Sequence, residues 1–142
     1  MTEAESKTVI RDVKRVYDKI TEYSQKAQLN PFLSYYDSSP SFLSFSSDGK
    51  MNNYEDFKQA CHNYYSSLKE QTVTTIAERI NVIDTNLVIV GWTGNITAAF
   101  KNGDIMEMEN YSITSVFKKT DGIWKVIHGH ESALPPKIIK QV

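Results

Sequence analysis

Hydrophobic positions recur at intervals of three and four residues near the start of the chain, with charged and amide side chains between them. This spacing places one apolar stripe along a helix, so the pattern predicts an amphipathic helix over about residues 5–28. Asn30-Pro31 ends the pattern, because proline disfavours helical geometry in the residue before it. Pro31 itself suits the first turn of a short helix through Tyr36. The stripe of the long helix consists of Val9, Val13, Val16 and Ile20.

A third helix is predicted after a short apolar segment. Phe42, Leu43 and Phe45 are typical of a brief strand, which the turn-forming Ser47-Asp48-Gly49 ends. Asn53 is a suitable cap for the next helix, because its side chain accepts hydrogen bonds from free backbone amides. The apolar stripe of that helix repeats at i, i+4, i+7 and i+11, as Phe57, Cys61, Tyr64 and Leu68.

After Gln71 the pattern changes to alternation of apolar and polar residues, with many β-branched side chains. This period of two is typical of strands, and the turn residues between the segments separate five of them. Helices followed by an antiparallel meander predict an α+β fold with the helices on one face of the sheet. We expect one domain over residues 1–134 and a C-terminal tail over residues 135–142. The strands are predicted at about 72–83, 86–94, 96–101, 104–119 and 123–131.

Composition narrows the class of protein. With 142 residues the chain is long enough for one domain with a buried core. Its 16 basic and 17 acidic residues give a formal net charge of −1, so we expect neither nucleic acid nor a membrane as partner. The N-terminal segment lacks a secretory pattern, and no apolar run approaches the ~18 residues of a membrane span, which predicts a cytoplasmic protein. A single cysteine, Cys61, excludes an internal disulfide and is interpreted as an apolar filler.

Two hairpin turns predict which side chains share a face of the sheet. Asn102-Gly103 and Asp121-Gly122 suit two-residue turns, in which the flanking residues pair directly. One face should then collect polar and aromatic groups beside apolar ones, as the wall of a pocket would. Trp92 joins this face if Gly94 is not a bulge. The face is predicted to hold Ala98, Glu107, Glu109, Tyr111, Ile113, Ser115, Phe117, Val126, His128 and His130, and the opposite face Met106, Met108, Val116 and Ile127.

Three titratable residues of the predicted inner face are candidates for proton transfer. His128 and His130 can act as general acid or base or bind a carboxylate or phenol, and the alternative is that they fill the polar end of the sheet. Partial burial would raise the pKa of Glu109 and make it a base, whereas a register shift would leave it exposed. The sequence His-x-His also presents two nitrogens to a metal, but no third ligand has a diagnostic spacing, so no metal is expected. No glycine-rich phosphate loop is present, so no cofactor is expected.

The segment from Tyr111 to Phe117, followed by Asp121 to Ser132, resembles the last two strands of nuclear transport factor 2-like domains. Within that superfamily it is most similar to SnoaL-like proteins and to the association domain of calcium/calmodulin-dependent kinase II. The resemblance implies a cone-shaped, curved antiparallel sheet with about three helices over its concave face, a cystatin-like roll. It also implies a homodimer, because homodimers are common in this superfamily.

The same resemblance implies which residues of this chain occupy the positions of the family's site residues. Ketosteroid isomerases of the superfamily carry a tyrosine donor on the first helix, and Tyr17 is its counterpart by position. Their aspartate base falls at Ser44 or Phe45, where no carboxylate is available, so the same mechanism requires Asp37, Asp48 or Glu109 to substitute from another direction. Kinase association domains line their pocket with arginines, where this chain has Ser115 and Glu131. Strict alternation puts Glu131 opposite His130, so either Gly129 marks a bulge or the transfer fails at this position.

Two hypotheses for function follow. The first is a small-molecule-binding domain, possessing a conical pocket and acting as a cofactor-independent isomerase or lyase on a neutral or weakly polar ligand. The second is a homo-oligomerisation module with a vestigial pocket, which associates through the outer sheet face. For the first hypothesis the catalytic candidates are Glu109, His128, His130 and Tyr17, and the ligand-binding candidates are Trp92, Tyr111, Ser115 and Glu131.

Overall fold

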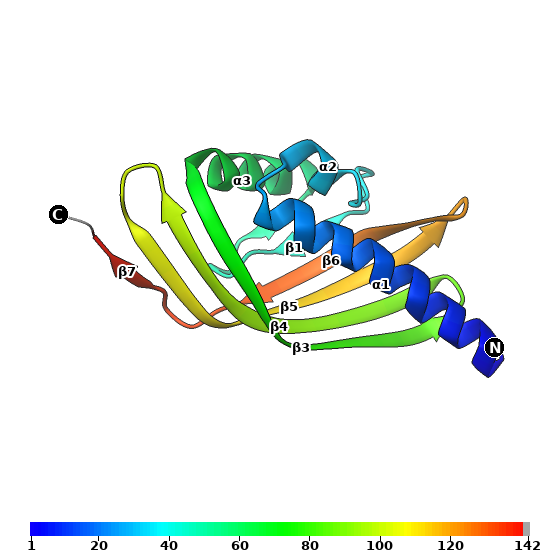
Figure 1. Cartoon of the computed structure of the whole chain (residues 1–142). Coiled ribbons are helices and arrows are strands. Elements are labelled where there is room, and N and C mark those ends of the chain that lie inside the picture. Colours follow the sequence, from blue (N-terminus) through cyan, green and yellow to red (C-terminus); the bar gives the residue numbers. More distant parts are fainter. Residues whose placement is uncertain (141–142) are drawn as a thin grey trace.

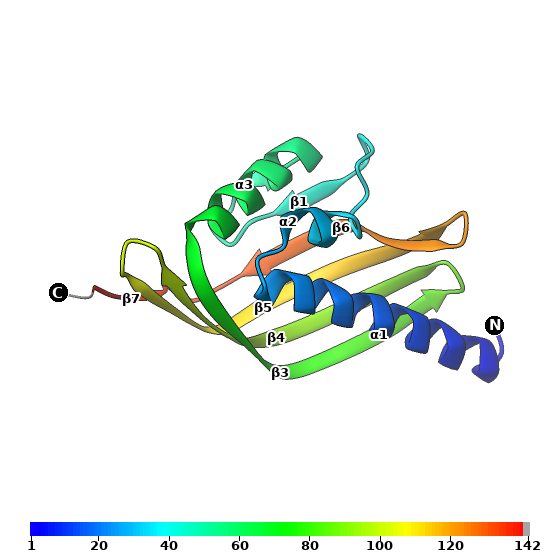
Figure 2. The same cartoon turned by 45° about the horizontal axis from the view of Figure 1, so that its top comes forward.

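The computed structural model describes residues 1–140, which form three helices and one curved sheet of seven strands (Figures 1 and 2). The strand order is β2-β1-β6-β5-β4-β3, and β7 pairs with β5 beyond this path. β1 runs parallel to β6, so the sheet is mixed rather than wholly antiparallel. The elements are α1 (Glu3–Gln25), α2 (Leu29–Leu33), β1 (Leu43–Phe45), β2 (Met51–Asn52), α3 (Tyr54–Ser67), β3 (Leu68–Asp84), β4 (Leu87–Phe100), β5 (Ile105–Thr120), β6 (Ile123–Ser132) and β7 (Lys137–Ile139).

The long first helix forms as its apolar spacing predicts. Thr2 accepts a hydrogen bond from the Glu5 amide while the Glu5 carboxylate accepts one from the Thr2 amide, which satisfies two free donors at the helix start. The helix ends at Gln25, before the predicted stop, because Ala27 adopts a left-handed conformation with φ of 54°. The buried stripe packs on the concave face of the sheet and consists of Val9, Val13, Tyr17 and Ile20.

The cap of α3 is also the predicted one, since the Asn53 side chain accepts a hydrogen bond from the Asp56 amide at 2.8 Å. Leu68 belongs to β3 and not to the helix. The segments predicted as 86–94 and 96–101 form one continuous strand, β4. The predicted C-terminal tail contributes β7, which pairs with β5 through Ile105, Met106 and Glu107.

A bulge in β5 reverses the predicted faces near the first hairpin. Glu109 and Asn110 together lie opposite the single residue Asn95, and Asn110 has φ of 52°. Because one extra residue moves the side chains before it to the other face, Met106 and Met108 point into the molecule. The predicted inner location of Glu107 and Glu109 is therefore wrong, as is the outer location of the two methionines.

A second bulge, in β6, reverses the predicted faces near the end of the chain. Phe117 pairs with Val126 as predicted, but Val116 pairs with His128, so Ile127 is the extra residue. Beyond it Gly129 and Glu131 face inward. The predicted inner location of His128 and His130 is wrong for this reason. Of the two alternatives for Glu131, the bulge is correct, although it lies at Ile127 rather than at Gly129.

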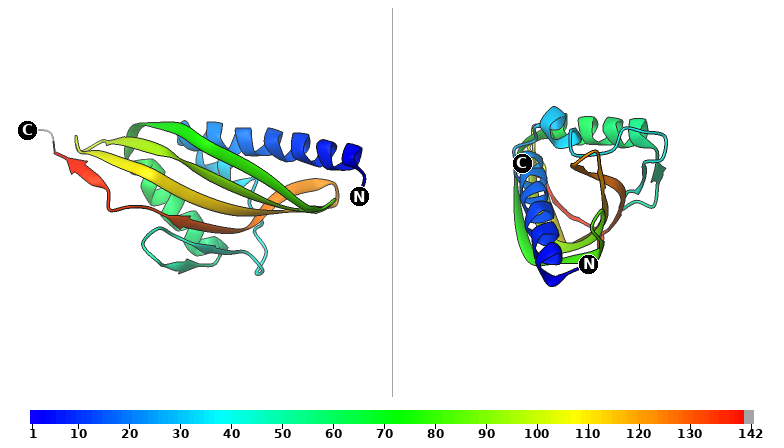
Figure 3. Two further views of the ribbon diagram at one scale, coloured as in Figure 1. Left: turned by 90° about the horizontal axis from the view of Figure 1, so that it is seen from below. Right: turned by 90° about the vertical axis from the view of Figure 1, so that its right-hand side faces the viewer.

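The core fills the space between α1 and the narrow end of the sheet. Phe117, Val13, Val88, Val90 and Val126 are fully buried there. The helices all lie on the concave side, as the view along the sheet in Figure 3 shows. Within residues 1–140 no helix is long and apolar enough to cross a membrane. The wide end of the sheet, under α2 and α3, is where a pocket remains.

Candidate functional site

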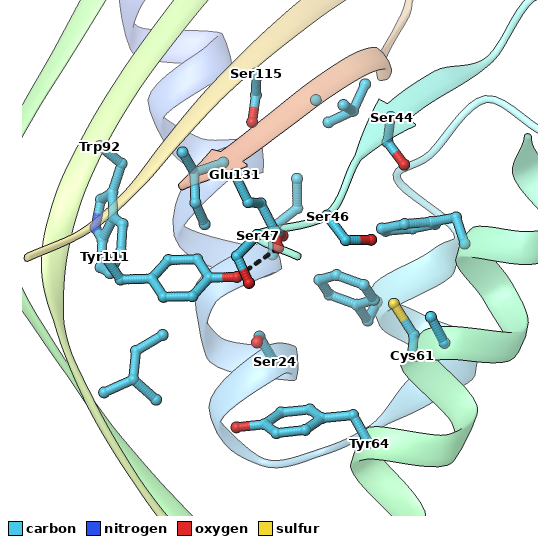
Figure 4. A pocket seen from close by; sticks show the side chains of 18 of the residues that line it. Ser24, Ser44, Ser46, Ser47, Cys61, Tyr64, Trp92, Tyr111, Ser115 and Glu131 are labelled. Carbon is cyan, nitrogen blue, oxygen red and sulfur yellow. Dashed lines mark hydrogen bonds between the residues drawn. The ribbon is translucent and has the colours of Figure 1, made fainter. Parts of the chain in front are cut away.

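A cavity of about 490 Å³ lies between the three helices and the concave face of the sheet (Figure 4). This volume is in the range of small-molecule sites, about 300–1,000 Å³. Aromatic and aliphatic side chains form most of its wall. Its ionisable carboxyl groups are Asp48 and Glu131, and within the described chain no lysine, arginine or histidine lines it. The aromatic part of the wall includes Tyr17, Phe32, Tyr36, Phe42, Phe57, Tyr64, Tyr65, Trp92 and Tyr111.

Glu131 and Tyr111 form a hydrogen-bonded pair inside this cavity. The Tyr111 hydroxyl donates to Glu131 Oε2 at 2.5 Å, from the neighbouring strand β5 (Figure 4). Burial raises the pKa of Glu131, the hydrogen bond from Tyr111 opposes that rise, and the negative charge of Asp48 adds to it. Burial, with the charge of Glu131, also raises the pKa of Tyr111, so its phenol keeps its proton. The pair therefore presents one titratable carboxyl, held in place by one fixed donor.

The turn between β1 and β2 lies over this pair. Ser47 projects toward the Tyr111 hydroxyl in Figure 4. Asp48 is exposed and accepts a hydrogen bond from the Lys50 amide at 3.0 Å, which holds the turn in shape. The turn thus brings one further carboxylate to the cavity wall.

The helical wall is fixed by a chain of hydrogen bonds. The Tyr64 hydroxyl donates to Gln71 Oε1 at 2.8 Å, and the Gln71 amide donates to the Ser24 carbonyl. The Tyr65 hydroxyl donates to Ser24 Oγ at 3.1 Å. These bonds join α1, α3 and β3, so Tyr64, Tyr65, Gln71 and Ser24 are held in place by their partners on neighbouring elements.

Trp92 forms the sheet side of the cavity, and Gly94 determines where its ring can lie. The indole N–H donates to Thr75 Oγ1 at 2.9 Å. A Cβ on Gly94 would lie 2.5 Å from ring atoms of Trp92 and 2.4 Å from the Thr74 carbonyl oxygen, so only glycine fits. The side chains of β4 alternate between the two faces of the sheet without a bulge at Gly94, so Trp92 lies on the inner face as predicted.

The structure brings five of the eight predicted site residues together and separates three from them. Trp92, Tyr111, Ser115, Glu131 and Tyr17 line the cavity, and burial raises the pKa of Tyr17. Glu109 is exposed on the outer face. His128 and His130 also lie outside, where Phe45 stacks on the His130 ring at 5.1 Å between centroids and meets His128 edge-on at 6.3 Å.

Sequence reasoning missed other cavity residues. Met106 and Met108 line the cavity but are predicted on the opposite face, and Asp48, predicted as a turn residue and as one possible substitute for the missing family base, lies on the cavity wall. The asparagine at position 110 was the available signal, since Asn tolerates the left-handed conformation of a bulge. Cys61 lines the cavity, but burial raises the pKa of its thiol to about 12, which makes it a poor nucleophile at neutral pH.

No group of three or more His, Cys, Asp or Glu side chains suited to a metal ion occurs in the described residues. The outward location of His128 and His130 also removes them from the cavity carboxylates. The site is therefore a mostly apolar cavity in which the half-buried Glu131 carboxyl lies beside Tyr111.

Known structures share this architecture at low sequence identity. A nuclear transport factor 2-like superfamily protein from Salmonella enterica is 18% identical with a TM-score of 0.76, covering 92% of this chain and 94% of its own. Hexachlorocyclohexane dehydrochlorinase LinA-type3 from Novosphingobium barchaimii is 10% identical with a TM-score of 0.80, covering 99% and 97%. A proposed calcium/calmodulin-dependent kinase II association domain from Xanthomonas campestris is 17% identical with a TM-score of 0.73, covering 88% and 87%.

These structural similarities establish the fold alone. A search of curated proteins finds no match to the sequence. The model of the SnoaL-like domain family matches residues 13–136, which include all three helices except the start of α1, and strands β1 to β6. The chain therefore belongs to the SnoaL-like domain family and has the nuclear transport factor 2-like fold.

Proposed function

We propose that this protein binds a small, mainly apolar and uncharged molecule in the cavity, and that it is an isomerase or lyase in which Glu131 transfers a proton. The observation that carries the proposal is the position of Glu131. Its carboxyl lies in an apolar cavity, next to Tyr111 and away from any basic side chain of the described wall. A carboxyl whose pKa burial has raised above its ordinary value is a stronger base than an exposed carboxylate and is suited to general base catalysis.

The chemistry follows from the properties of this carboxyl. The ionised Glu131 takes a proton from an acidic C–H bond of the bound molecule and becomes a carboxylic acid. In an isomerase it returns that proton to another carbon, and in a lyase a leaving group departs from the neighbouring carbon. Tyr111 stays protonated and orients the carboxyl throughout. The dehydrochlorinase of the same fold supports a lyase by analogy of fold only.

The cavity wall selects the ligand by charge. Asp48 and Glu131 contribute negative charge, and no basic group of the described wall offsets it. A carboxylate ligand would lose its hydration on entering the cavity and would be repelled by the two carboxylates of the wall. A neutral ring system avoids both costs and buries its apolar surface against the aromatic side chains. We therefore expect neutral aromatic and polycyclic compounds to bind more tightly than carboxylic acids.

The alternative hypothesis, a homo-oligomerisation module, has less support because two residues of its predicted interface are not on the outer sheet face. It relied on an outer sheet face that included Met106 and Met108, and both line the cavity. Val116 and Ile127 remain half-buried on the outer side. Homodimer formation remains a prediction that is independent of the proposed activity.

The test begins with thermal denaturation in the presence of neutral aromatic, polycyclic, polyketide-like and carboxylic acid compounds. Compounds that stabilise the protein in a saturable manner are then incubated with it in D₂O, and deuterium incorporation at carbon is measured by mass spectrometry. We expect Glu131→Gln to lower the exchange rate by about 10²-fold or more, since general base catalysis contributes 10²–10⁴. Glu109→Gln is the matched control, because its side chain is exposed on the outer face.

Exchange by Glu131→Gln at the wild-type rate would refute Glu131 as the base. Absence of any saturable stabilisation, together with a melting temperature that rises with protein concentration, would instead favour the association module.

A further inference from the structure

Four inward-facing residues form a row across four neighbouring strands of the sheet. Asn52 pairs with Ser44, Ser44 with Gly129, and Gly129 with Ser115. Ser44, Gly129 and Ser115 line the cavity. The row places two serine hydroxyls side by side with Gly129 on the sheet wall of the cavity.

Both serine side chains are shielded from bulk water. Ser44 and Ser115 are each 5% exposed. Ser44 Oγ is buried without a hydrogen-bond partner among the residues described. In Figure 4 the Ser115 hydroxyl projects from β5 toward the cavity. A buried hydroxyl without a partner costs free energy, so an occupant that pairs with it gains affinity.

Gly129 leaves open the space between the two serines. Adjacent strands lie about 4.8 Å apart, which puts the Cα atoms of Ser44 and Ser115 about 10 Å apart with Gly129 midway between them. A Cβ on Gly129 would meet only the Thr114 carbonyl oxygen, at 3.9 Å. The backbone therefore does not require glycine here, and the absent side chain leaves room above Gly129 on the cavity wall.

We propose that Ser44, Gly129 and Ser115 form a subsite that binds a carbonyl oxygen of an uncharged ligand. The oxygen lies above Gly129, where it accepts a hydrogen bond directly from the Ser44 hydroxyl after rotation about χ1, and the Ser115 hydroxyl on the other side of Gly129 reaches it through a bridging water. Glu131 follows Gly129 by two residues on the same face, about 7 Å along the strand, so the rest of the ligand extends toward it. This inference rests on the proposed function and narrows its ligand class to ketones and related carbonyl compounds.

A structural role for Ser44 is the competing explanation. Asn52 Oδ1 is also buried without a partner in residues 1–140, and Asn52 lies directly opposite Ser44. If the two side chains served only each other, removing the Ser44 hydroxyl would lower stability without changing any preference between ligands. The experiment therefore compares two ligands that differ in one oxygen, and it measures stability separately.

The probes are three pairs matched in shape and of increasing size: indane and 1-indanone, fluorene and 9-fluorenone, and 5α-androstane and 5α-androstan-17-one. Dissociation constants are obtained from the ligand dependence of thermal denaturation followed by circular dichroism. For the pair that binds wild type, we expect Ser44→Ala and Ser115→Ala each to weaken ketone binding about 3- to 10-fold, the effect of one lost neutral hydrogen bond. Hydrocarbon binding should not change.

Two further variants complete the design. Gly129→Ala places a methyl group where the oxygen would lie and should remove the ketone preference while the protein stays folded. Ser112→Ala is the matched control, since it removes a hydroxyl from the half-buried outer side of the same strand as Ser115.

Equal loss of ketone and hydrocarbon affinity in the serine variants, or lower stability with an unchanged ketone preference, would overturn the subsite while the cavity remains a binding site. Failure of all six probes to bind wild type would overturn the subsite and count against the proposed function as well.

Discussion

Replacing Gly94 with alanine should destabilise the protein strongly through a single methyl group. The new Cβ would lie 2.4 Å from the Thr74 carbonyl oxygen and 2.5 Å from two ring atoms of Trp92. The Thr74 oxygen belongs to the backbone of the paired strand β3, so it cannot move without disturbing the ladder. The Trp92 ring has to leave its place, which breaks its hydrogen bond to Thr75.

The magnitude follows from these two losses. Overpacking of a close-packed site costs about 1–3 kcal/mol. A lost hydrogen bond costs about 1 kcal/mol more. We therefore expect Gly94→Ala to lower the free energy of unfolding by about 3 kcal/mol, which corresponds to a fall of about 10 °C in melting temperature for a domain of this size.

The assay is urea denaturation followed by tryptophan fluorescence, with Gly91→Ala as matched control. Gly91 lies three residues earlier in β4 on the opposite face, and a Cβ there would meet no atom of the described residues within 4 Å. Alanine at this position should change stability by less than about 1 kcal/mol, and should favour the folded state because the unfolded chain loses freedom. Equal stabilities for the two variants would refute the assignment of Gly94 as the residue that fixes the Trp92 wall.

Two further predictions concern the β5 bulge and the cavity carboxyl. Asn110→Ala should destabilise the protein by about 1 kcal/mol, because the left-handed conformation costs an ordinary residue about 1–2 kcal/mol. Asn110→Gly should be nearly neutral, because glycine adopts this conformation freely. Equal losses of stability for the two variants in urea denaturation would contradict this explanation of the bulge. Folding raises the pKa of Glu131 above its ordinary 4.5, so the stability that its protonation contributes is complete below that value and is lost as the pH rises through the folded pKa. The stability of Glu131→Gln relative to wild type should therefore improve from pH 4 to pH 7, and a constant difference would contradict a raised pKa of Glu131.

The helices could be predicted from the sequence because residues close together along the chain determine where a helix forms and begins. The spacing of Val9, Val13 and Ile20 and the cap at Asn53 need no distant partner. The strands could also be located, since alternation and the Asp121-Gly122 turn mark their ends. Membership of the family followed from the last two strands and agrees with the family model.

The sequence does not predict which side chains of β5 and β6 face inward, because this depends on whether the strand contains a bulge, which adds one residue opposite its partner strand. Alternation was counted outward from the turns, and it fails beyond a bulge. The bulge at Asn110 exchanged Glu109 for Met108 on the inner face, and the bulge at Ile127 exchanged His130 for Glu131. Glu131 is predicted as a site residue by the family resemblance and not by the alternation of the strand.

The central claim is that the cavity is a binding site, and closing it tests that claim most directly. Ala60 is an exposed residue of α3 that also lines the cavity, so the indole of Ala60→Trp should cover the cavity from this side. Lys58→Trp is the matched control, because Lys58 is exposed two residues earlier on the same helix and points away from the cavity. Both variants are screened against the neutral aromatic and polycyclic compounds by thermal denaturation. We predict saturable stabilisation of wild type and Lys58→Trp that is lost in folded Ala60→Trp. Equal stabilisation of all three proteins, or of none, would contradict the account.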